Sequence, residues 1–455
     1  MEAMSADKKN IMYNYTVEDH RRRLQNIRLA EKTGTVSKAK HLVTDYIRGQ
    51  FVWQSDRFSE KDEELIKYLA QNGIGMIQLW EKVSRKDHKE GDDPNTWEMH
   101  LGEKMYRPYD ARLCAEFIET AHKYGIKVLP YTSTNFYRVI ANDFDPAWAL
   151  PREADLCGVL AHCSPASPGW RERILKQYTG ILDEFDFDGV YIDTGYTRPA
   201  DYMRLEPHYL PEAKVAEDEV LAFEENSDFD GAMGDLLALI YGEVKSRGGI
   251  VKIHKEGIDT IRTDMRVYDY LWVGECITDL DFMRQRTGFY RPYVVPDFNY
   301  KLEDDDERYL HSIPYMQFPV VRNGTMGIGS PDADRPDFER QLKWLSLYTR
   351  LTEYGTWCYI DCDAPAIVPQ KGKNTVVSLF INRDIYIVAA NYGYTDDTVT
   401  VAGAACEYTP DGEGERINKS FVLPGRKLRV FKYEGANTVG TTAEKRNIES
   451  GLMDD

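Results

Sequence analysis

The sequence predicts an α/β fold, a (β/α)8 TIM barrel followed by a C-terminal antiparallel β-sandwich. Within residues 45–355, segments typical of buried strands alternate with segments typical of amphipathic helices, which indicates a parallel sheet covered by helices. Eight such strands with their helices need roughly the number of residues that this segment contains, as expected for a closed barrel. From about residue 356 the strands become short, β-branched and separated by turn residues, as in a sandwich.

The individual elements are predicted from hydrophobic spacing and from the residues that begin and end helices. The first helix has a capping box formed by Ser59 and Asp62 and stops at Gly73, and a later one has Ser167 as its N-cap. The predicted strands lie at residues 46–55, 74–81, 126–133, 189–193, 250–257, 268–275, 291–298 and 313–320. The predicted helices lie at residues 59–73, 109–125, 167–185, 234–249 and 335–355.

These elements set the predicted domain boundaries. They are 1–44 for a polar, mostly helical arm, 45–355 for the catalytic barrel with a polar insertion at 196–230, 356–434 for the sandwich, and 435–455 for a disordered tail. A doubly wound open sheet is the alternative, but it usually has a Gly-rich phosphate-binding turn after its first strand. Residues 53–62 contain no such turn.

Composition excludes several classes of protein. The formal net charge of -18 and the pI of about 5.1 argue against nucleic acid and anionic membranes as partners, because both require clustered Lys and Arg. The N-terminal residues lack the apolar core of a signal peptide, and no run is long enough to span a bilayer. We therefore expect a soluble, cytoplasmic protein. A homo-oligomer is compatible with the sequence.

Asp193 ends the fourth predicted strand, "GVYID", at the edge of a barrel where active sites form. Asp186 and Asp188 precede this strand, and we expect them to be solvated turn residues at the opposite edge. Two further acids, Glu256 and Glu275, follow the fifth and sixth strands. The other residues expected to line the same edge and to bind substrate are Trp80, Glu81, Tyr131, Asn135, Tyr191, Lys252, His254, Trp272 and Asp297.

The chemistry of this edge favours a pair of carboxylates. The His/Cys grouping of a zinc centre and the G-x-S-x-G elbow of acyl transfer are both missing, so we predict no metal and no cofactor. Cleavage of a glycosidic bond uses two carboxylates: one attacks the anomeric carbon and the other protonates the leaving oxygen. The second acid needs a raised pKa, which burial beside a ring such as that of Trp272 could supply. A carbohydrate is therefore the expected substrate.

The motif "DGVYIDTG" at residues 188–195, followed by "LWVGE" at residues 271–275, resembles the barrel of retaining α-glycosidases. This grouping includes α-galactosidases, α-glucosidases and endo-α-N-acetylgalactosaminidases, and its all-β C-terminal domain is also similar. The resemblance covers residues 45–434 as architecture. It implies that Asp193 is the nucleophile. It implies Glu275 as the acid/base if the α-glucosidase branch is followed, and Glu256 if the endo-acting branch is followed; Glu275 is favoured.

Other interpretations remain open at this point. The barrel could bind a sugar without hydrolysing it, or it could be an isomerase or lyase with His254 or Lys252 as the base. Asp193 could also be an N-cap or a partner of Arg198. The insertion at 196–230 follows Asp193 directly, so we expect it over the barrel mouth, against substrate or a neighbouring subunit.

Overall fold

The computed structural model describes residues 42–46, 60–85, 97–101, 105–109, 111–134, 136–138, 143–148, 160–193, 229–254, 267–273, 279–281, 284, 294–296, 306–317, 319–321, 338–352, 357–359, 361, 370–381 and 383–435. The chain divides into two compact units. The first comprises Met1–Arg23, Asp45–Ile66 and Ile77–Val273, and the second comprises Leu24–Thr44, Lys67–Met76 and Gly274–Asp455. The predicted arm, insertion and tail fall almost entirely outside the described residues.

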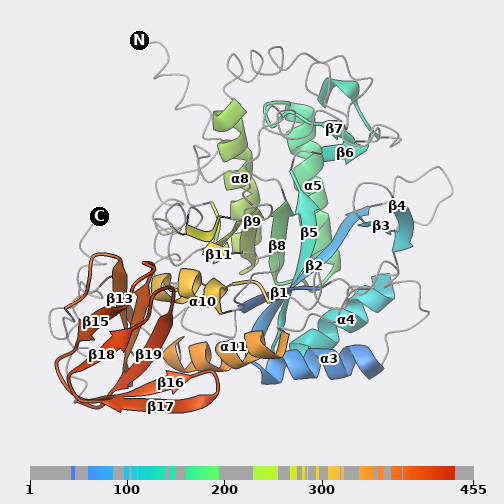
Figure 1. Ribbon diagram of the computed structural model, residues 1–455. Coiled ribbons are helices and arrows are strands. Elements are labelled where there is room, and N and C mark those ends of the chain that lie inside the picture. The colour runs from blue at the N-terminus through green and yellow to red at the C-terminus, as the bar shows by residue number, and fades with distance from the viewer. Residues whose placement is uncertain are drawn as a thin grey trace, which may run out of the picture. The chain divides into compact units, whose positions relative to one another are not determined.

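The first unit is built on a parallel sheet (Figure 1). Its central strands, in spatial order, are β10 (Tyr270–Val273), β9 (Ile250–His254), β8 (Gly189–Asp193) and β5 (Lys127–Ser133), and each neighbouring pair runs parallel. The order continues through β2 (Ile74–Arg85), β3 (Trp97–Leu101) and β4 (Met105–Tyr109), and β3 runs antiparallel to both β2 and β4. The parallel core confirms the α/β prediction. Among the described residues the sheet does not close on itself, so closure into a barrel stays a prediction.

Helices alternate with these strands along the chain, as the spacing predicts. They are α3 (Glu60–Gln71) before β2, α4 (Ala111–Lys123) before β5, α5 (Pro168–Glu184) before β8 and α8 (Phe229–Ser246) before β9. The start of α5 confirms the predicted cap, because the Ser167 side chain accepts a hydrogen bond from the Trp170 N–H and Pro168 follows it.

The beginnings of β8 and β9 approach each other too closely for a side chain. Gly189 has a φ of +148°, and a Cβ there would lie 2.0 Å from the carbonyl oxygen of Ile250. Only glycine fits both the backbone angle and the space. This contact fixes the register of β8 against β9, which determines the neighbours of Asp193 at the other end of the strand.

Asp188, just before β8, corrects the expectation of a solvated turn. Its carboxylate accepts hydrogen bonds from the Val128 N–H at 2.8 Å and from Lys127 at 3.1 Å, and it pairs with His122 at 2.8 Å. The side chain is 16% exposed, whereas that of Asp186 is 93% exposed, as expected. Asp188 therefore joins the start of β5 to α4 and has a structural role.

Several short strands of the first unit were not predicted. They are the hairpin β3–β4 and the pair β6 (Phe136–Arg138) and β7 (Leu160–His162), near the 3-10 turn η4 (Pro146–Trp148). The first described strand, β1 (Leu42–Tyr46), lies earlier than the prediction at 46–55, of which residues 47–55 fall outside the described part of the chain.

In the second unit the predicted strand at 313–320 is wrong. Residues Glu307–Ser312 form α10, and Ile313–Tyr315 continue as the 3-10 turn η7. Pro314 cannot donate to a strand ladder, and its carbonyl instead accepts a hydrogen bond from Ser378 at 2.6 Å. The short strand β11 (Val294–Pro296) and the helix α11 (Phe338–Thr352) confirm the elements predicted around them.

The end of the chain forms the antiparallel structure that the sequence predicts, drawn in orange and red in Figure 1. One sheet has the order β12 (Trp357–Tyr359), β13 (Thr375–Ile381), β14 (Ile385–Asn391), β19 (Leu428–Tyr433), β16 (Ala405–Thr409) and β17 (Gly412–Ile417). A second sheet pairs β15 (Asp397–Thr400) with β18 (Ser420–Leu423). Both sheets contribute to one buried core, which includes Leu379, Val399 and Phe431.

Candidate active site

Asp193 is the last residue of β8, and its carboxylate is held from both neighbouring strands. The Tyr131 hydroxyl on β5 donates to Oδ2, and His254 on β9 places Nδ1 2.5 Å from Oδ1. An ionised Asp193 carboxylate only accepts hydrogen bonds, so we assign the proton at this contact to His254 Nδ1. The Asp193 side chain is 18% exposed, whereas that of His254 is 2% exposed. Asp193 is therefore the member of this pair that a substrate can reach.

The strand register explains why these three side chains meet. Neighbouring residues in register on parallel strands point to the same face of a sheet. Ser133 is the register partner of Asp193, and Tyr131 lies two residues earlier on the same face of β5. The pairing of β8 with β9 runs up to the residues just before Asp193 and His254. The structure thus brings together three residues that the sequence assigned to strand ends.

Aromatic rings enclose the His254 imidazole. The Trp272 ring meets it edge-on at 4.0 Å between centroids, and the Tyr191 ring stacks against it at 6.3 Å. Tyr191 also contacts Tyr131, with ring centroids 5.5 Å apart. Tyr191 and Trp272 are fully buried. Their packing fixes the orientation of the imidazole relative to Asp193.

Lys252 lies two residues before His254 on the same face of β9 and is fully buried. Its ammonium donates to the Gln78 side-chain oxygen and lies 5.2 Å from the Tyr191 ring centroid and 5.9 Å from that of Trp272. Gln78 is also fully buried, on β2. Gln78 was not among the predicted site residues, although it is a polar residue in the apolar run "IGMIQLW".

Tyr178 of α5 extends the network. The Tyr191 carbonyl can only accept, so Thr132 donates to it at 2.7 Å, and the Tyr178 hydroxyl then donates to Thr132 at 2.9 Å. Burial raises the pKa of Tyr178, and the negative charge of Asp193 adds to this rise. Tyr178 therefore stays a neutral donor at physiological pH.

The remaining predicted site residues are not placed by the structure. Four of them fall outside the described residues: Asn135, Glu256, Glu275 and Asp297. The backbones of Trp80 and Glu81 belong to β2, but their side chains are outside the description. Within the described part of the chain, no group of three or more His, Cys, Asp or Glu side chains could hold a metal ion. No helix there is long and apolar enough to cross a membrane.

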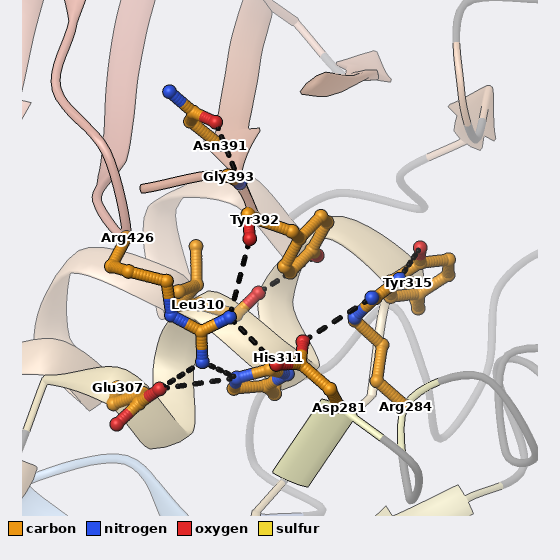
Figure 2. Close-up of polar contacts among 10 residues, drawn as sticks. All are labelled: Asp281, Arg284, Glu307, Leu310, His311, Tyr315, Asn391, Tyr392, Gly393 and Arg426. Atoms are coloured by element: carbon orange, nitrogen blue, oxygen red, sulfur yellow. Dashed lines mark hydrogen bonds and ion pairs between the residues drawn. The ribbon is translucent and has the colours of Figure 1, made fainter. Parts of the chain in front are cut away.

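A second polar cluster lies in the second unit (Figure 2). We call it the Arg426 cluster; it consists of Asp281, Arg284, Glu307, His311, Tyr315, Tyr392 and Arg426. Arg426 occupies the turn between β18 and β19 with a φ of 56°, which is rare for a residue with a side chain. Its guanidinium donates to Asp281 at 2.8 Å, to Glu307, and to His311 Nε2 at 3.2 Å.

Arg284 completes the Arg426 cluster. Its guanidinium lies over the Tyr392 ring, 3.7 Å from the centroid, and donates to Asp281 at 3.3 Å. His311 is buried, and its Nε2 lies 3.5 Å from Glu307. Burial lowers the pKa of His311 to about 4; the carboxylates of Asp281 and Glu307 oppose this shift, and the guanidinium of Arg426 adds to it. His311 is therefore neutral at physiological pH.

The fold is similar to that of several solved glycoside hydrolases. A maltogenic α-amylase from Thermotoga neapolitana has a TM-score of 0.53 at 13% identity, over 87% of this chain and 99% of that chain. An α-amylase from Geobacillus thermoleovorans, solved with acarbose, has a TM-score of 0.54 at 12% identity, over 88% and 99%. An α-galactosidase from Geobacillus stearothermophilus has a TM-score of 0.50 at 11% identity, over 91% and 58%.

These likenesses concern the fold. They confirm, at that level, the resemblance to α-glycosidases that the sequence motifs indicate. No protein-family model matches the sequence, and no curated protein sequence matches it. The activity of this chain therefore has to be argued from its own residues.

Proposed function

We propose that the protein is a glycoside hydrolase that cleaves an α-glycosidic bond with retention of configuration, using Asp193 as the nucleophile. The observation that carries the proposal is the partly exposed Asp193 carboxylate, held by two donors at the carboxyl end of a central parallel strand. That edge is where enzymes of this architecture place their catalytic groups. The proposal includes closure of residues 45–355 into a (β/α)8 barrel, followed by a sandwich at 356–434.

The proposed reaction has two steps, the formation and the hydrolysis of a covalent glycosyl-enzyme intermediate. In the first, an oxygen of Asp193 bonds to the anomeric carbon while the bond from that carbon to the leaving oxygen breaks, and an acid gives that oxygen a proton. In the second, water attacks the same carbon, the bond to Asp193 breaks, and the acid's conjugate base takes the proton from water. We assign the acid/base role to Glu275, with Glu256 as the alternative; both lie outside the described residues.

The substrate-binding roles stay proposals as well. Trp80, Glu81, Asn135 and Asp297 would contact the sugar ring and its hydroxyl groups from other strand ends. The structural likeness to α-amylases and to an α-galactosidase supports a carbohydrate as the substrate. Lys252, which is fully buried against Gln78, would support the floor of the site.

The geometry favours hydrolysis over the isomerase or lyase alternative. A general base must come within hydrogen-bond reach of the proton that it removes. The His254 side chain is 2% exposed with Nδ1 engaged by Asp193, and Lys252 is 0% exposed. Neither group is therefore positioned to take a proton from a substrate. Only a measurement of substrate turnover distinguishes the proposed hydrolase from a barrel that binds sugar without cleaving it.

The test is a panel of aryl α-glycosides that includes galactosides, glucosides and N-acetylated sugars, incubated with the full chain. We expect turnover of at least one member, with release of the α-anomer first, observed by proton NMR before mutarotation. Release of the β-anomer would contradict retention. Measurable binding of the same sugars without turnover of any member would instead support a non-hydrolytic barrel.

The acid/base assignment has its own test. Loss of the true acid/base spares the first step for an activated aryl leaving group, because that group needs no protonation, and azide then replaces the water that the missing base no longer activates. We expect azide to restore turnover in Glu275→Ala and to have little effect in Glu256→Ala. The opposite pattern would move the role to Glu256.

A further inference from the structure

Tyr131 and His254 were predicted to bind substrate, and in the structure both contact Asp193. Both donate to its carboxylate, one to each oxygen, and they come from the strands on either side. Two hydrogen bonds from different strands therefore hold the carboxylate in one orientation. Together they fix the rotamer of Asp193 more firmly than either hydrogen bond alone.

The surroundings of His254 leave its side chain little room to contact a substrate. Its side chain is 2% exposed and is enclosed by the rings of Trp272 and Tyr191. A side chain in that environment cannot reach a sugar while its Nδ1 donates to Asp193. Tyr131 is packed against Tyr191 through its ring, and its hydroxyl is the part that meets the carboxylate.

We propose that His254 and Tyr131 are positioning residues that orient the Asp193 carboxylate and keep it ionised, and that they do not bind substrate. This inference rests on the proposed function for its effect on the reaction, although the contacts themselves do not depend on it. Hydrogen bonds donated to an ionised carboxylate favour that form. The same bonds make the carboxylate a better leaving group when water releases the sugar.

The kinetic test uses one variant of Tyr131 and two variants of His254. Tyr131→Phe removes the hydroxyl and keeps the ring, and His254→Leu removes the donor, whereas His254→Asn keeps an N–H near the position of Nδ1. With the aryl glycoside that the wild type turns over, we expect Tyr131→Phe and His254→Leu to lower kcat about ten- to a hundredfold with KM little changed. His254→Asn should recover part of that loss.

The pH profile separates positioning from ordinary structural damage. Without a donor the ionised carboxylate is less stabilised, so the acid limb of kcat/KM should move upward by about one pH unit in Tyr131→Phe and His254→Leu. Matched controls are Tyr137→Phe, whose hydroxyl pairs with Asp143 at 2.5 Å, and His122→Asn, which removes the pair with Asp188. Neither control touches Asp193, and neither should move the limb.

Two outcomes would overturn the inference. An increase in KM with unchanged kcat would make these residues substrate contacts. Equal losses in His254→Leu and His254→Asn with an unmoved acid limb would make them merely structural. If circular dichroism showed His254→Leu to be unfolded, Tyr131→Phe, which keeps its ring packing, would decide the question.

A readout without substrate separates this inference from the proposed function. Selective 15N labelling of the 9 histidines gives ring-nitrogen signals from which the tautomer of His254 is read. We expect Nδ1 to be protonated in the wild type and this preference to weaken in Asp193→Ala, because its acceptor is gone. This result would support the contact even if no glycoside were cleaved. An unchanged His254 spectrum in Asp193→Ala would refute the contact whatever the activity.

Discussion

Two buried histidines in this protein face carboxylates, yet their surroundings differ in one decisive way. His254 donates to Asp193, whose side chain keeps 18% exposure and receives a second donor from Tyr131. His311 lies between Glu307 and the guanidinium of Arg426, in the Arg426 cluster (Figure 2). At the first site a carboxylate accepts from a histidine and a tyrosine, whereas at the second each carboxylate accepts from an arginine.

The contrast shows how the candidate site differs from the Arg426 cluster. In the Arg426 cluster, Asp281 accepts from both Arg426 and Arg284. Burial raises the pKa of Asp281, but the nearby Arg426 outweighs it, and the pKa lies below its usual value. Among the described residues, the guanidinium groups of Arg426 and Arg284 therefore balance the carboxylates of Asp281 and Glu307. The hydrogen bonds to Asp193 come instead from Tyr131 and His254.

The largest expected effect is on activity at the first site. Asp193→Ala should lower kcat/KM at least about a thousandfold, because no covalent intermediate can form. It should cost only about 1–3 kcal/mol of stability, from the buried donors of His254 and Tyr131 that lose their acceptor. Steady-state kinetics measure the loss of kcat/KM, and urea unfolding measures the loss of stability. Retained activity would remove Asp193 from the mechanism.

The Arg426 cluster should show the reverse pattern. Arg426→Ala leaves the carboxylates of Asp281 and Glu307 without their main partner, and we expect a loss of about 2–3 kcal/mol because the side chains are partly exposed. Measured well below the unfolding transition, kcat/KM should stay within about twofold of the wild type.

A surface ion pair supplies the control for this variant. Arg416 pairs with Glu434 at 2.6 Å, and its side chain is 69% exposed. Arg416→Ala should therefore cost about 0–1 kcal/mol. Equal losses in Arg416→Ala and Arg426→Ala, measured by urea unfolding, would mean that the cluster contributes no more than a solvated pair.

Much of the fold follows from hydrophobic periodicity. Runs such as "GVYID" and the cap at Ser167 predict β8 and α5 from local residues alone. The hairpin β3–β4 was missed because its strands contain Pro108 and several charged or polar residues. The predicted strand at 313–320 was wrong because burial of Ile313 and the fixed geometry of Pro314 favour a 3-10 turn there.

The sequence predicted where the candidate site would lie but not the contacts within it. A single acid at the end of an apolar strand made Asp193 the candidate, and alternation along β9 places Lys252 and His254 on one face. The hydrogen bonds of Asp193 join residues 62 and 61 positions apart, so they depend on a strand register that no local pattern contains. The bond from Arg426 to Asp281 spans 145 positions and was invisible for the same reason.

The smallest expected effect is the pH dependence of stability that His311 causes. Its pKa is lowered to about 4 in the folded protein, by burial first and with the charge of Arg426 added against the opposing charges of Asp281 and Glu307. In the unfolded chain the pKa of a histidine is about 6.5, so between these values the unfolded state binds more protons and stability falls as the pH falls.

The loss from His311 amounts to about 1.4 kcal/mol per pH unit within that window, or about 2 kcal/mol between pH 6.5 and pH 5. His311→Gln keeps an acceptor for Arg426 but does not titrate, so its urea midpoint should change less between pH 7 and pH 5 than that of the wild type. Parallel midpoint shifts in wild type and His311→Gln would show that His311 is not the group responsible, and that the Arg426 cluster accommodates the imidazolium as readily as water does.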